Sequence, residues 1–294
     1  MRIVDLFAGC GGMSLGFEKA GFDIVAAFEK WAAAAECHRA NLNHPVYETD
    51  LSDVEEAVCV ISALKPDVII GGPPCQDFSS AGKRIEAGRA GLTESFAKIV
   101  AEVMPTSFVM ENVANARKSN AYSTARNIFK AAGYGLTEVV LDASYCGVPQ
   151  KRKRFFCVGM LGREDGFALQ MLQERLSDKP LTVRKYFGDR LDFEYYYRHP
   201  RNYNRRAIFS VDEPAPTVRG VNCGVAPGYH GNPSDACPVS QVTHALTTAD
   251  RAMIQTFPED FKWPEKKTAA EQMIGNAVPV NLAAYVAGVL KEVI

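Results

Sequence analysis

The chain has 294 residues, of which 47% are hydrophobic and 23% are charged. This composition is typical of an ordinary globular protein, and the length is enough to bury one large core and a smaller one. Eight cysteines without a CxxC pair or a regular Cys/His spacing argue against a disulfide framework and a zinc site, so we expect no metal.

The formal net charge of −1 gives no sign of a nucleic-acid partner. A balanced total can hide a local basic face, however, and four arginines, with no acid among them, follow closely at Arg198, Arg201, Arg205 and Arg206. Charge alone leaves open whether they form a solvated loop or a binding surface. The first residues, MRIVDLFAGCGG, resemble neither a signal peptide nor a membrane span, so we expect a cytoplasmic protein without a membrane partner.

Short β-rich apolar runs alternate with longer helical patterns up to about residue 161. The expected strands are Ile3–Phe7, Ile24–Phe28, Val46–Thr49, Val68–Ile70, Phe108–Met110, Thr137–Leu141 and Phe155–Met160. The expected helices are Ala32–Ala40, Val54–Leu64, Thr93–Val103 and Ser123–Ala131. Such a strand–helix–strand repeat predicts a doubly wound α/β fold, with a parallel sheet and helices on both faces.

The pattern changes from about residue 180. Tyrosines cluster among arginines, and prolines and glycines crowd residues 214–238, which predicts short strands and long loops in a separate small domain. Helical patterning returns near Ala249 and ends in the apolar run Val280–Val293, which we expect to pack on the first domain. The expected division is 1–180 for the first domain, 181–245 for the second, and 246–294 for a segment that returns to the first.

The first motif, Asp5-Leu-Phe-Ala-Gly-Cys-Gly-Gly12, is a strand that ends in glycines and opens a helix. Glycines let backbone amides approach a ligand at a helix N-terminus. Glu29 ends the next expected strand, where a carboxylate can hold a ribose diol. Because the run lacks the G-x-G-x-x-G order of dinucleotide sites, it favours a nucleoside cofactor without a pyrophosphate over NAD.

The second motif, Gly71-Gly-Pro-Pro-Cys-Gln-Asp-Phe-Ser79, directly follows the fourth expected strand. The prolines fix φ in front of Cys75, and the carboxyl end of a parallel strand is where such sheets bind ligands. A lone cysteine is usually a core residue. Here the polar neighbours Gln76 and Asp77 make burial in an apolar core unfavourable, so the motif indicates a nucleophile.

Three further motifs follow. Glu111 and Asn112 end the fifth expected strand, so Glu111 would face the same crevice as Cys75, and Asn112 could instead cap a helix. In Gln150-Lys-Arg-Lys-Arg154, alternating residues of an extended segment share a face, so Arg152 and Arg154 should point together. A solvated basic edge is the alternative for that run. The last motif, Gln272-Met-Ile-Gly-Asn-Ala-Val-Pro279, is a tight turn before the final helix.

In this order and spacing, DLFAGCGG, GGPPCQDFS, ENV, QKRKR and IGNAVP resemble the DNA (cytosine-5)-methyltransferase family of bacterial restriction–modification systems. The resemblance covers nearly the whole chain except about residues 180–240. It implies a Rossmann-like sheet of the S-adenosylmethionine-dependent methyltransferases, together with a small, loop-rich, mainly β recognition domain. It also implies double-stranded DNA as substrate and a monomer. A restriction endonuclease of the same specificity would act independently.

By that resemblance, the cofactor is S-adenosylmethionine and its product is S-adenosylhomocysteine. Glu29 would hold the ribose hydroxyls and Asp50 the adenine amino group. The residue after this glutamate often packs on the adenine in the family. Here Lys30 stands there and Trp31 follows, so either could cover the ring. The complete set implied for the pocket is Phe7, Gly9, Gly11, Gly12, Glu29, Asp50, Asn276 and Val278.

The resemblance assigns catalysis to Cys75, Glu111, Arg152 and Arg154. Addition of the Cys75 thiolate to C6 of a flipped-out cytosine makes C5 nucleophilic. Glu111, protonated or sharing a proton with N3, would meet the charge that arises on the ring, which requires a raised pKa. Arg154 or Arg152 would hold O2 and the adjacent phosphate.

Residues 180–240 would then read the DNA sequence. The family's Pro-Thr pair in that domain is matched by Pro216-Thr217. The tRNA cytosine-5-methyltransferases share the catalytic residues and are the alternative, but a variable domain rich in arginine and proline, without an evident RNA module, favours duplex DNA. The candidate DNA-binding residues are Arg198, Arg201, Arg205, Arg206, Thr217 and Arg219.

Overall fold

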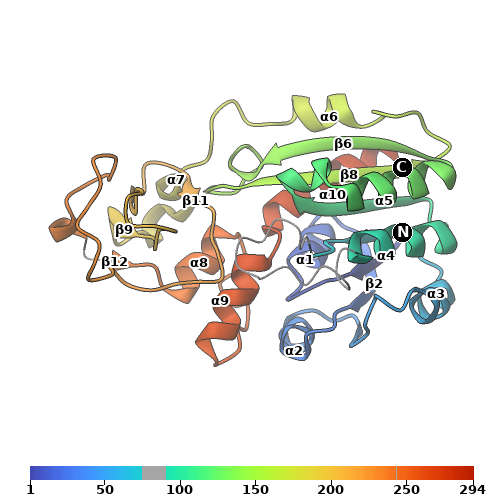
Figure 1. Cartoon of the computed structure of the whole chain (residues 1–294), viewed down its shortest axis with the longest axis horizontal. Coiled ribbons are helices and arrows are strands. Elements are labelled where there is room, and N and C mark those ends of the chain that lie inside the picture. Colours follow the sequence, from blue (N-terminus) through green and yellow to red (C-terminus); the bar gives the residue numbers. More distant parts are fainter. Residues whose placement is uncertain (75–90, 243) are drawn as a thin grey trace. The chain divides into compact units, whose positions relative to one another are not determined.

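The structure is a computed structural model that describes residues 1–74, 91–242 and 244–294 (Figure 1). Cys75 and the polar residues that follow it therefore lie outside the described residues. The chain forms two compact units, each made of several segments. Unit 1 comprises Met1–Leu141, Lys153–Leu176 and Ala283–Ile294, and unit 2 comprises Asp142–Arg152 and Ser177–Leu282.

Unit 1 is built on a seven-stranded sheet with the strand order β3-β2-β1-β4-β5-β8-β6. All seven strands expected from the sequence are present, because each is an apolar run that the sheet buries. Their bounds are β1 Arg2–Leu6, β2 Asp23–Phe28, β3 Val46–Tyr47, β4 Val68–Gly71, β5 Ser107–Val113, β6 Tyr134–Asp142 and β8 Lys153–Leu161. The order reverses between β1 and β4, which places the carboxyl ends of both strands at the switch point where such sheets bind ligands.

The direction of β8 differs from the parallel sheet that the sequence predicts. Strands β1 to β5 pair in parallel, but β8 runs antiparallel to β5. The physical reason is the short connection between β6 and β8. Parallel neighbours need a long crossover, usually a helix, whereas residues 143–152 between β6 and β8 form no α-helix.

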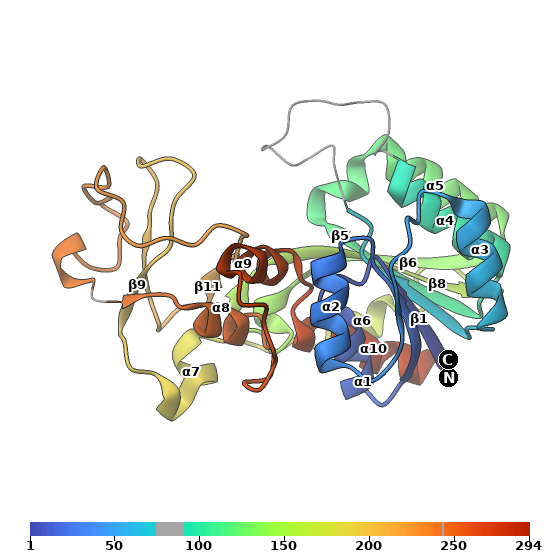
Figure 2. The ribbon, with the colours of Figure 1, turned by 90° about the horizontal axis from the view of Figure 1, so that it is seen from below.

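Helices cover both faces of this sheet, as expected. Figure 2 shows α3, α4 and α5 on one face and α1 and α10 on the other. On the first face the Phe108 ring of β5 stacks on Phe129 of α5, with centroids 4.2 Å apart, inside the main core. The bounds are α1 Gly12–Lys19, α2 Ala32–Asn41, α3 Val54–Ala63, α4 Gly91–Val103, α5 Asn120–Ala131, α6 Leu169–Glu174 and α10 Val280–Val293, with the 3₁₀ turns η1 Ala114–Lys118 and η2 Ala143–Tyr145.

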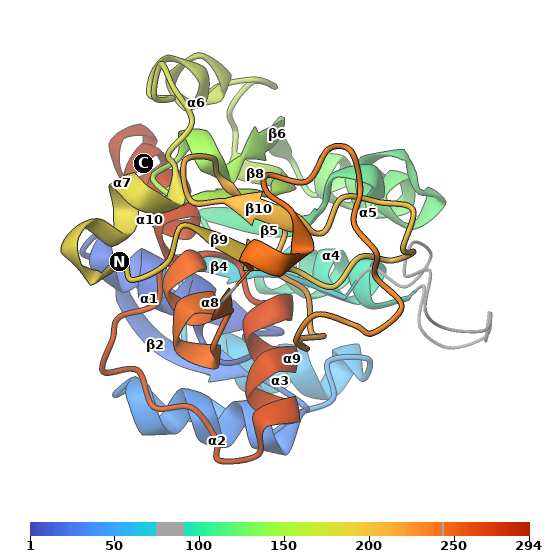
Figure 3. The ribbon, with the colours of Figure 1, turned by 90° about the vertical axis from the view of Figure 1, so that its left-hand side faces the viewer.

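Unit 2 contains two small sheets and short helices (Figure 3). One sheet has the order β10-β9-β12 and the other pairs β11 with β7. Tyr197, Ile208 and Tyr229 form the centre of a small core of its own. The bounds are β7 Gln150–Lys151, β9 Tyr195–Tyr197, β10 Ile208–Ser210, β11 Ala215–Pro216, β12 His244–Ala245, α7 Val183–Phe187, η3 Gly188–Arg190, η4 Val239–Gln241, α8 Thr248–Ile254 and α9 Lys267–Asn276.

The sequence predicts that residues 246–294 return to the first domain, but in the structure the return to unit 1 begins later. Residues 246–282 belong to unit 2, and the return begins at Ala283. Helices α8 and α9 belong to unit 2, where Arg251 of α8 forms a buried ion pair with Glu271 of α9 and donates a hydrogen bond to the Arg219 carbonyl. The functional labels of the three ranges, catalytic and recognition, remain predictions.

Residues Lys267–Val293 are apolar enough, over a sufficient length, to cross a membrane. This is weak evidence for a span, because core helices have the same composition. In this protein 61% of the most apolar window is buried, and Pro279 lies in the break between α9 and α10. Leu282, Val286 and Leu290 of α10 are at most 1% exposed, as expected for a core helix.

Candidate functional site

The glycine loop between β1 and α1 has an unusual backbone. Phe7, Gly9 and Gly11 all have positive φ, at 56°, 56° and 95°. A side chain at Gly11 would be blocked, because its Cβ would lie 2.6 Å from Leu42 Cδ1. Gly9 has no atom within 4 Å of the corresponding position, so space remains open beside it. Gly12 then begins α1, which gives the strand–glycine–helix geometry expected from the sequence.

Glu29 joins the end of β2 to this loop. Its Oε2 accepts a hydrogen bond from the Gly9 amide at 2.8 Å, and its Oε1 accepts one from the Trp31 amide at 2.7 Å. A carboxylate oxygen can accept more than one hydrogen bond, so both oxygens keep capacity for a ligand. The structure therefore brings Gly9 and Glu29 together, as the sequence predicts.

Asp50 lies in an ion pair with Lys30, which the sequence did not predict. Its Oδ1 also accepts hydrogen bonds from the amide and hydroxyl of Ser52, at 3.1 and 2.8 Å. The hydrogen bond from Lys30, followed by those from Ser52, lowers the pKa of Asp50 to about 2. The Lys30 ammonium is thus engaged by Asp50, while the Trp31 side chain is 38% exposed.

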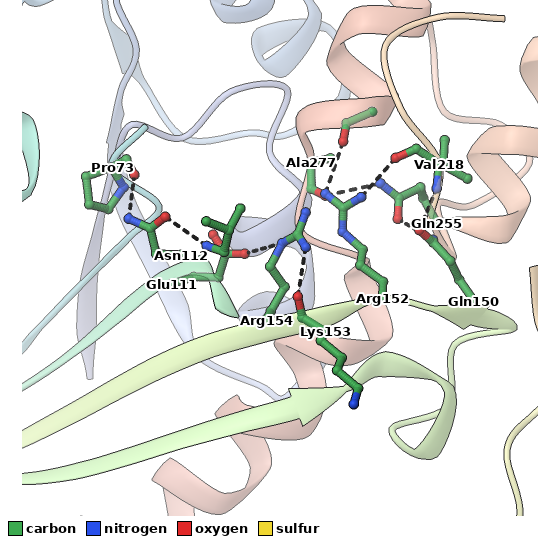
Figure 4. A network of polar contacts seen from close by, with 12 residues as sticks. Pro73, Glu111, Asn112, Gln150, Arg152, Lys153, Arg154, Val218, Gln255 and Ala277 are labelled. Atoms are coloured by element: carbon green, nitrogen blue, oxygen red, sulfur yellow. Dashed lines mark hydrogen bonds and ion pairs between the residues drawn. The ribbon is translucent and has the colours of Figure 1, made fainter. Parts of the chain in front are cut away.

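Glu111 and Arg154 form a largely buried ion pair in unit 1. Arg154 Nε lies 2.9 Å from Glu111 Oε1, and the two side chains are only 14% and 11% exposed (Figure 4). The antiparallel register of β5 and β8 sets Arg154 opposite Val113, at the end of β5 that carries Glu111. Burial lowers the pKa of Arg154 and the Glu111 carboxylate counteracts this effect.

Asn112 fixes the backbone that leads to Cys75. Its Nδ2 donates to the Pro73 carbonyl at 3.1 Å, and its Oδ1 accepts from the Val113 amide at 2.8 Å (Figure 4). A Cβ at Gly72 would lie 3.2 Å from Glu111 Oε2, so the same segment also approaches Glu111. The alternative helix-capping role is wrong, because the first residue before η1 is Val113 and no side chain caps that turn. Sequence reasoning missed the contact between Asn112 and Pro73.

Arg152 has different neighbours from Arg154, although the burial of Gln150 and Arg152 and the exposure of Lys151 and Lys153 follow the alternation that the sequence predicts. It is 1% exposed, and within unit 2 it donates to the carbonyls of Val218 at 3.0 Å, Gly275 at 3.0 Å and Ala277 at 3.1 Å (Figure 4). The residues before Arg152 pair with β11, and those after it pair with β5, so the two arginines meet different partners.

A buried glutamine pair supports the same part of unit 2. Gln150 Nε2 donates to Gln255 Oε1 at 2.7 Å, while Gln150 Oε1 accepts from the Val218 amide at 2.9 Å. Gln255 stands in the run Ala249–Pro258, which resembles the family's segment that supports the recognition domain, and its hydrogen bond with Gln150 fits such a supporting role. Asn276 is the last residue of α9, and Val278 is 8% exposed. Because these two residues belong to unit 2, their part in a cofactor pocket stays a prediction.

Unit 2 gathers several of the expected DNA-binding residues around one small pocket. Arg198 donates to the Thr217 carbonyl at 2.8 Å, and Arg219 donates to the His199 carbonyl. Arg198, Arg219 and Arg251 all line this pocket. Burial, followed by the positive charges of Arg219 and Arg201, lowers the pKa of Arg198 to about 10. The pocket is therefore a place where positive charges crowd together.

The other arginines that the sequence assigns to DNA binding differ in their surroundings. Arg206 is held inside the unit, by an ion pair with Glu213 and by the Phe209 ring 4.4 Å from its guanidinium carbon. Arg201 and Arg205 are exposed, and within residues 1–74, 91–242 and 244–294 neither forms an ion pair. These two are the ones accessible to a partner.

A family model, the C-5 cytosine-specific DNA methylase, matches residues 1–292. The chain is 56% identical over 292 residues to the type II methyltransferase M.HindV of Haemophilus influenzae, covering 99% of this chain and 96% of that protein. It is 54% identical over 288 residues to the type II methyltransferase M.HgiDI of Herpetosiphon aurantiacus, covering 98% and 93% of the two chains.

Solved structures share the fold. A putative DNA modification methyltransferase encoded within an Escherichia coli prophage superimposes with a TM-score of 0.74 at 22% identity, covering 100% of this chain and 99% of that one. The Dnmt2 methyltransferase of S. pombe gives a TM-score of 0.72 at 18% identity, covering 99% and 98%. At these identities the likeness concerns the fold alone, and it agrees with the mixed seven-stranded sheet.

Proposed function

The chain belongs to the C-5 cytosine-specific DNA methylase family, and we propose that it methylates one cytosine within a short duplex DNA sequence, in a restriction–modification system. The family gives carbon 5 of cytosine as the methyl acceptor. It also implies S-adenosylmethionine, which supplies an electrophilic methyl group carried by a sulfonium. Two relatives more than half identical over nearly the whole chain are named type II methyltransferases.

The residues around the glycine loop fit this cofactor. The carboxylate of Glu29 is fixed by the amides of Gly9 and Trp31 and keeps acceptor capacity for two hydroxyl groups. Open space lies beside Gly9, where a larger residue would stand in the way. In our proposal Glu29 holds the ribose, the loop Phe7–Gly12 lies along the cofactor, and Asn276 and Val278 contribute from the C-terminal side.

The adenine end of the site is assigned to Trp31 rather than Lys30. The Lys30 ammonium pairs with Asp50, and an ammonium in such a contact is poorly placed to pack flat on a ring. The Trp31 indole is partly exposed, and its backbone is tied to the ribose-binding Glu29. We therefore propose that Trp31 covers the adenine, and that Asp50 accepts its amino group while still bound by Lys30.

The observation that carries the catalytic proposal is the convergence of β4 and β5. Asn112 holds the Pro73 carbonyl, Gly72 approaches Glu111, and Glu111 pairs with Arg154. Cys75 follows Pro73 by two residues in the sequence. In the proposed reaction the Cys75 thiolate adds to C6 of the cytosine, which makes C5 nucleophilic toward the methyl group. A water or hydroxide then removes the C5 proton, and the thiolate leaves C6, which restores the ring and the free cysteine.

Glu111 and Arg154 then serve the cytosine ring. In the proposal Glu111, protonated or sharing a proton with N3, meets the charge that arises on the ring, and Arg154 Nε lies 2.9 Å from its Oε1. Arg154 is the proposed donor to O2, since it already lies at the end of β5 with Glu111. Arg152 is assigned to unit 2 as a structural residue, because it donates to three carbonyls there. The base would be rotated out of the duplex to reach these groups.

DNA recognition is proposed for unit 2. Arg201 and Arg205 are exposed, as phosphate contacts require. Arg198 and Arg219 line a pocket, as base-reading groups would, and the Thr217 carbonyl accepts a hydrogen bond from Arg198. Arg206 is removed from the proposed set because Glu213 neutralises it. We further propose that the protein acts in the cytoplasm as a monomer, and that an endonuclease of the same specificity works independently of it.

Methylation of plasmid DNA followed by bisulfite sequencing tests this function. We expect one cytosine in a single short sequence to be fully methylated and other cytosines to be unchanged. Total tRNA, incubated under the same conditions, is the control for the alternative substrate. Methyl transfer to tRNA without transfer to duplex DNA would overturn the proposed substrate.

A further inference from the structure

The last turn of α9 lies in direct backbone contact with residues 217–220, which we call the reading loop. A Cβ at Gly275 in that turn would lie 2.3 Å from the backbone nitrogen of Gly220 and 2.5 Å from the carbonyl carbon of Arg219. Neither atom belongs to a side chain that could rotate away. Gly275 therefore lets the helix and the loop touch, and any larger residue there would push them apart.

A side-chain contact continues from the reading loop to Asn276. A Cβ at Gly220 would lie 2.4 Å from Oε1 of Gln272, and Nε2 of the same Gln272 donates to Asn276 Oδ1 at 3.2 Å. Asn276 is the last residue of α9 and is one of the two residues proposed to hold the cofactor from the C-terminal side. The loop therefore packs on the side chain that contacts this asparagine.

Arg152 joins the reading loop to the end of α9, and all of these residues belong to unit 2 (Figure 4). Its Nη1 donates to the Val218 carbonyl of the loop at 3.0 Å. Its Nη2 donates to the carbonyls of Gly275 and Ala277, the residues on either side of Asn276, at 3.0 and 3.1 Å. A guanidinium holds its donors in a rigid fork, so this one buried group sets the spacing between the two segments.

The end of a helix needs such donors. Its last carbonyls have no partner within the helix, and their partial negative charge favours a nearby cation. At the end of α9, Gln255 donates to the carbonyls of Ile274 and Ala277. Arg152 supplies the cation through its bonds to Gly275 and Ala277. The helix end is thus held by side chains from outside it.

The backbone of the reading loop is held by the same network. The Val218 amide donates to Oε1 of Gln150, and Gln150 in turn donates to Gln255. The carbonyl of Arg219, the next residue, accepts a hydrogen bond from Arg251 of α8. The amide and carbonyl of Val218 and the carbonyl of Arg219 are therefore all fixed from outside the loop.

We propose that Arg152 is a positioning residue for two sites at once: it holds the reading loop and the backbone on either side of Asn276 in one fixed relation, so that discrimination between DNA sequences and affinity for the cofactor depend on the same side chain. The inference rests on the proposed function, in which Arg219 reads DNA and Asn276 contacts the cofactor. Arg152 itself is 1% exposed and acts through the backbones that it binds.

The first experiment replaces the guanidinium. Arg152→Met keeps the length of the side chain and removes its donors. It should lower S-adenosylhomocysteine affinity, measured by calorimetry, about five-fold, the size of one ordinary hydrogen bond. By a similar factor it should lower the ratio of affinities for two duplexes, one with the methylated site found by bisulfite sequencing and one altered at a single base pair of that site. Arg152→Lys should recover part of both losses, because an ammonium still donates at the helix end but lacks the fork.

The salt dependence of DNA binding separates positioning from direct contact. A side chain that acts only through the backbone neutralises no phosphate, so Arg152→Met should leave the slope of log affinity against log salt unchanged. A slope reduced by about 0.9 would show that Arg152 itself contacts a phosphate, and would overturn the proposal.

A second set of variants separates the two segments without removing a donor, and it decides the question if Arg152→Met does not fold. Gly275→Ala places a methyl group against the backbone of the reading loop and should weaken cofactor binding and discrimination together. Gly220→Ala, which meets the end of the Gln272 side chain, should do the same to a smaller extent. Gly224→Ala is the matched control and should resemble the wild type, because nothing lies within 4 Å of its Cβ position and its φ is not positive.

Two results would overturn the proposal. If Arg152→Met and Gly275→Ala lowered cofactor affinity without lowering discrimination, or the reverse, the two segments would be positioned separately. If the unfolding free energy fell while both binding measurements stayed at their wild-type values, Arg152 would have a structural role only. The proposed function fails in a different way, in the wild type: absent affinity for S-adenosylhomocysteine, or absent discrimination between the duplexes, would contradict it and the inference with it.

Discussion

Nε of Arg154 and Oε1 of Glu111 lie 2.9 Å apart, on adjacent antiparallel strands, with both side chains largely buried. Arg154→Ala should lower the single-turnover methylation rate about 100- to 1000-fold on every DNA substrate, because it removes a donor to charge that develops on the ring. It should also destabilise the fold by about 3 kcal/mol, since it leaves a buried carboxylate without its guanidinium.

A matched double variant separates these two effects. Arg154→Ala combined with Glu111→Gln removes the buried charge as well, so denaturant unfolding should show much of the stability recovered, while methylation stays at least as slow as in Arg154→Ala. If Arg154→Ala weakened DNA binding alone and left the single-turnover rate unchanged, Arg154 would have no part in the chemical step.

Cys75→Ser should abolish methylation and leave S-adenosylhomocysteine affinity nearly unchanged, because the thiol acts on the base and not on the cofactor. Duplex DNA with 5-fluorocytosine at the target should trap the wild-type protein as a covalent complex that survives denaturing electrophoresis. The serine variant should form none. Appreciable turnover by Cys75→Ser would contradict the covalent mechanism.

Glu29→Ala should weaken cofactor binding by about 1.5–3 kcal/mol, the scale of hydrogen bonds to a charged group. The change removes the ribose contact and also the acceptor that holds the Gly9 amide. Calorimetry with S-adenosylhomocysteine measures the effect. Glu48→Ala is the control, because Glu48 is a carboxylate near β3 that pairs with Arg39 and not with the glycine loop. Equal affinities for the wild type and Glu29→Ala would rule out the assignment.

Asp5 should make the stability of the protein depend on pH. It is fully buried, its Oδ2 accepts from Ser14 at 2.6 Å, and its Oδ1 has no hydrogen-bond partner among the described residues. Burial raises its pKa from 3.8 to about 7. A raised pKa means that the protonated form is favoured in the folded state. Its stabilising contribution is therefore complete below about pH 4 and is lost as the pH rises through about 7, on the order of 4 kcal/mol in total.

Asp5→Asn cannot titrate, so the difference in unfolding free energy between wild type and variant should fall steadily from about pH 4 to about pH 7 and then become constant. Urea unfolding at several pH values measures this difference. A constant difference over the whole range would show that Asp5 has an ordinary pKa in the folded protein.

Three neighbouring arginines provide a controlled test of DNA binding. Arg201→Ala and Arg205→Ala should each weaken binding and reduce the slope of log affinity against log salt by about 0.9 for each phosphate that the variant no longer neutralises. Arg206→Ala should leave that slope unchanged, because Glu213 already neutralises its guanidinium. Binding titrations at several salt concentrations give the slopes. A reduced slope for Arg206→Ala alone would reverse the assignment.

Much of the fold of unit 1 could be predicted, because buried strands appear as apolar runs in the sequence. Both ends of α10 were placed correctly, and all seven strands were found. The direction of β8 could not be predicted, since alternation of side chains shows which residues share a face but not which way a strand runs. Strand β3 was also expected to be longer than Val46–Tyr47.

The site was predictable where a motif is local, as in the contact between Gly9 and Glu29. Contacts between distant segments were not. Asn112 binds Pro73, which is 39 residues away, and Arg152 binds Gly275, which is 123 residues away. His38 Nδ1 contacts the carbonyl of Gly9, which is 29 residues away, and this contact exists only because α2 packs against the glycine loop. Periodicity contains no information about such contacts.

The contacts of Arg152 have a consequence for how specificity can change between relatives. All three acceptors, at Val218, Gly275 and Ala277, are backbone carbonyls. Every residue type carries a carbonyl, so substitutions at Val218 leave the acceptor in place as long as the path of the backbone is kept. If unit 2 reads DNA as proposed, the side chain at Val218 and those beside it can change with the recognised sequence while Arg152 still holds the backbone.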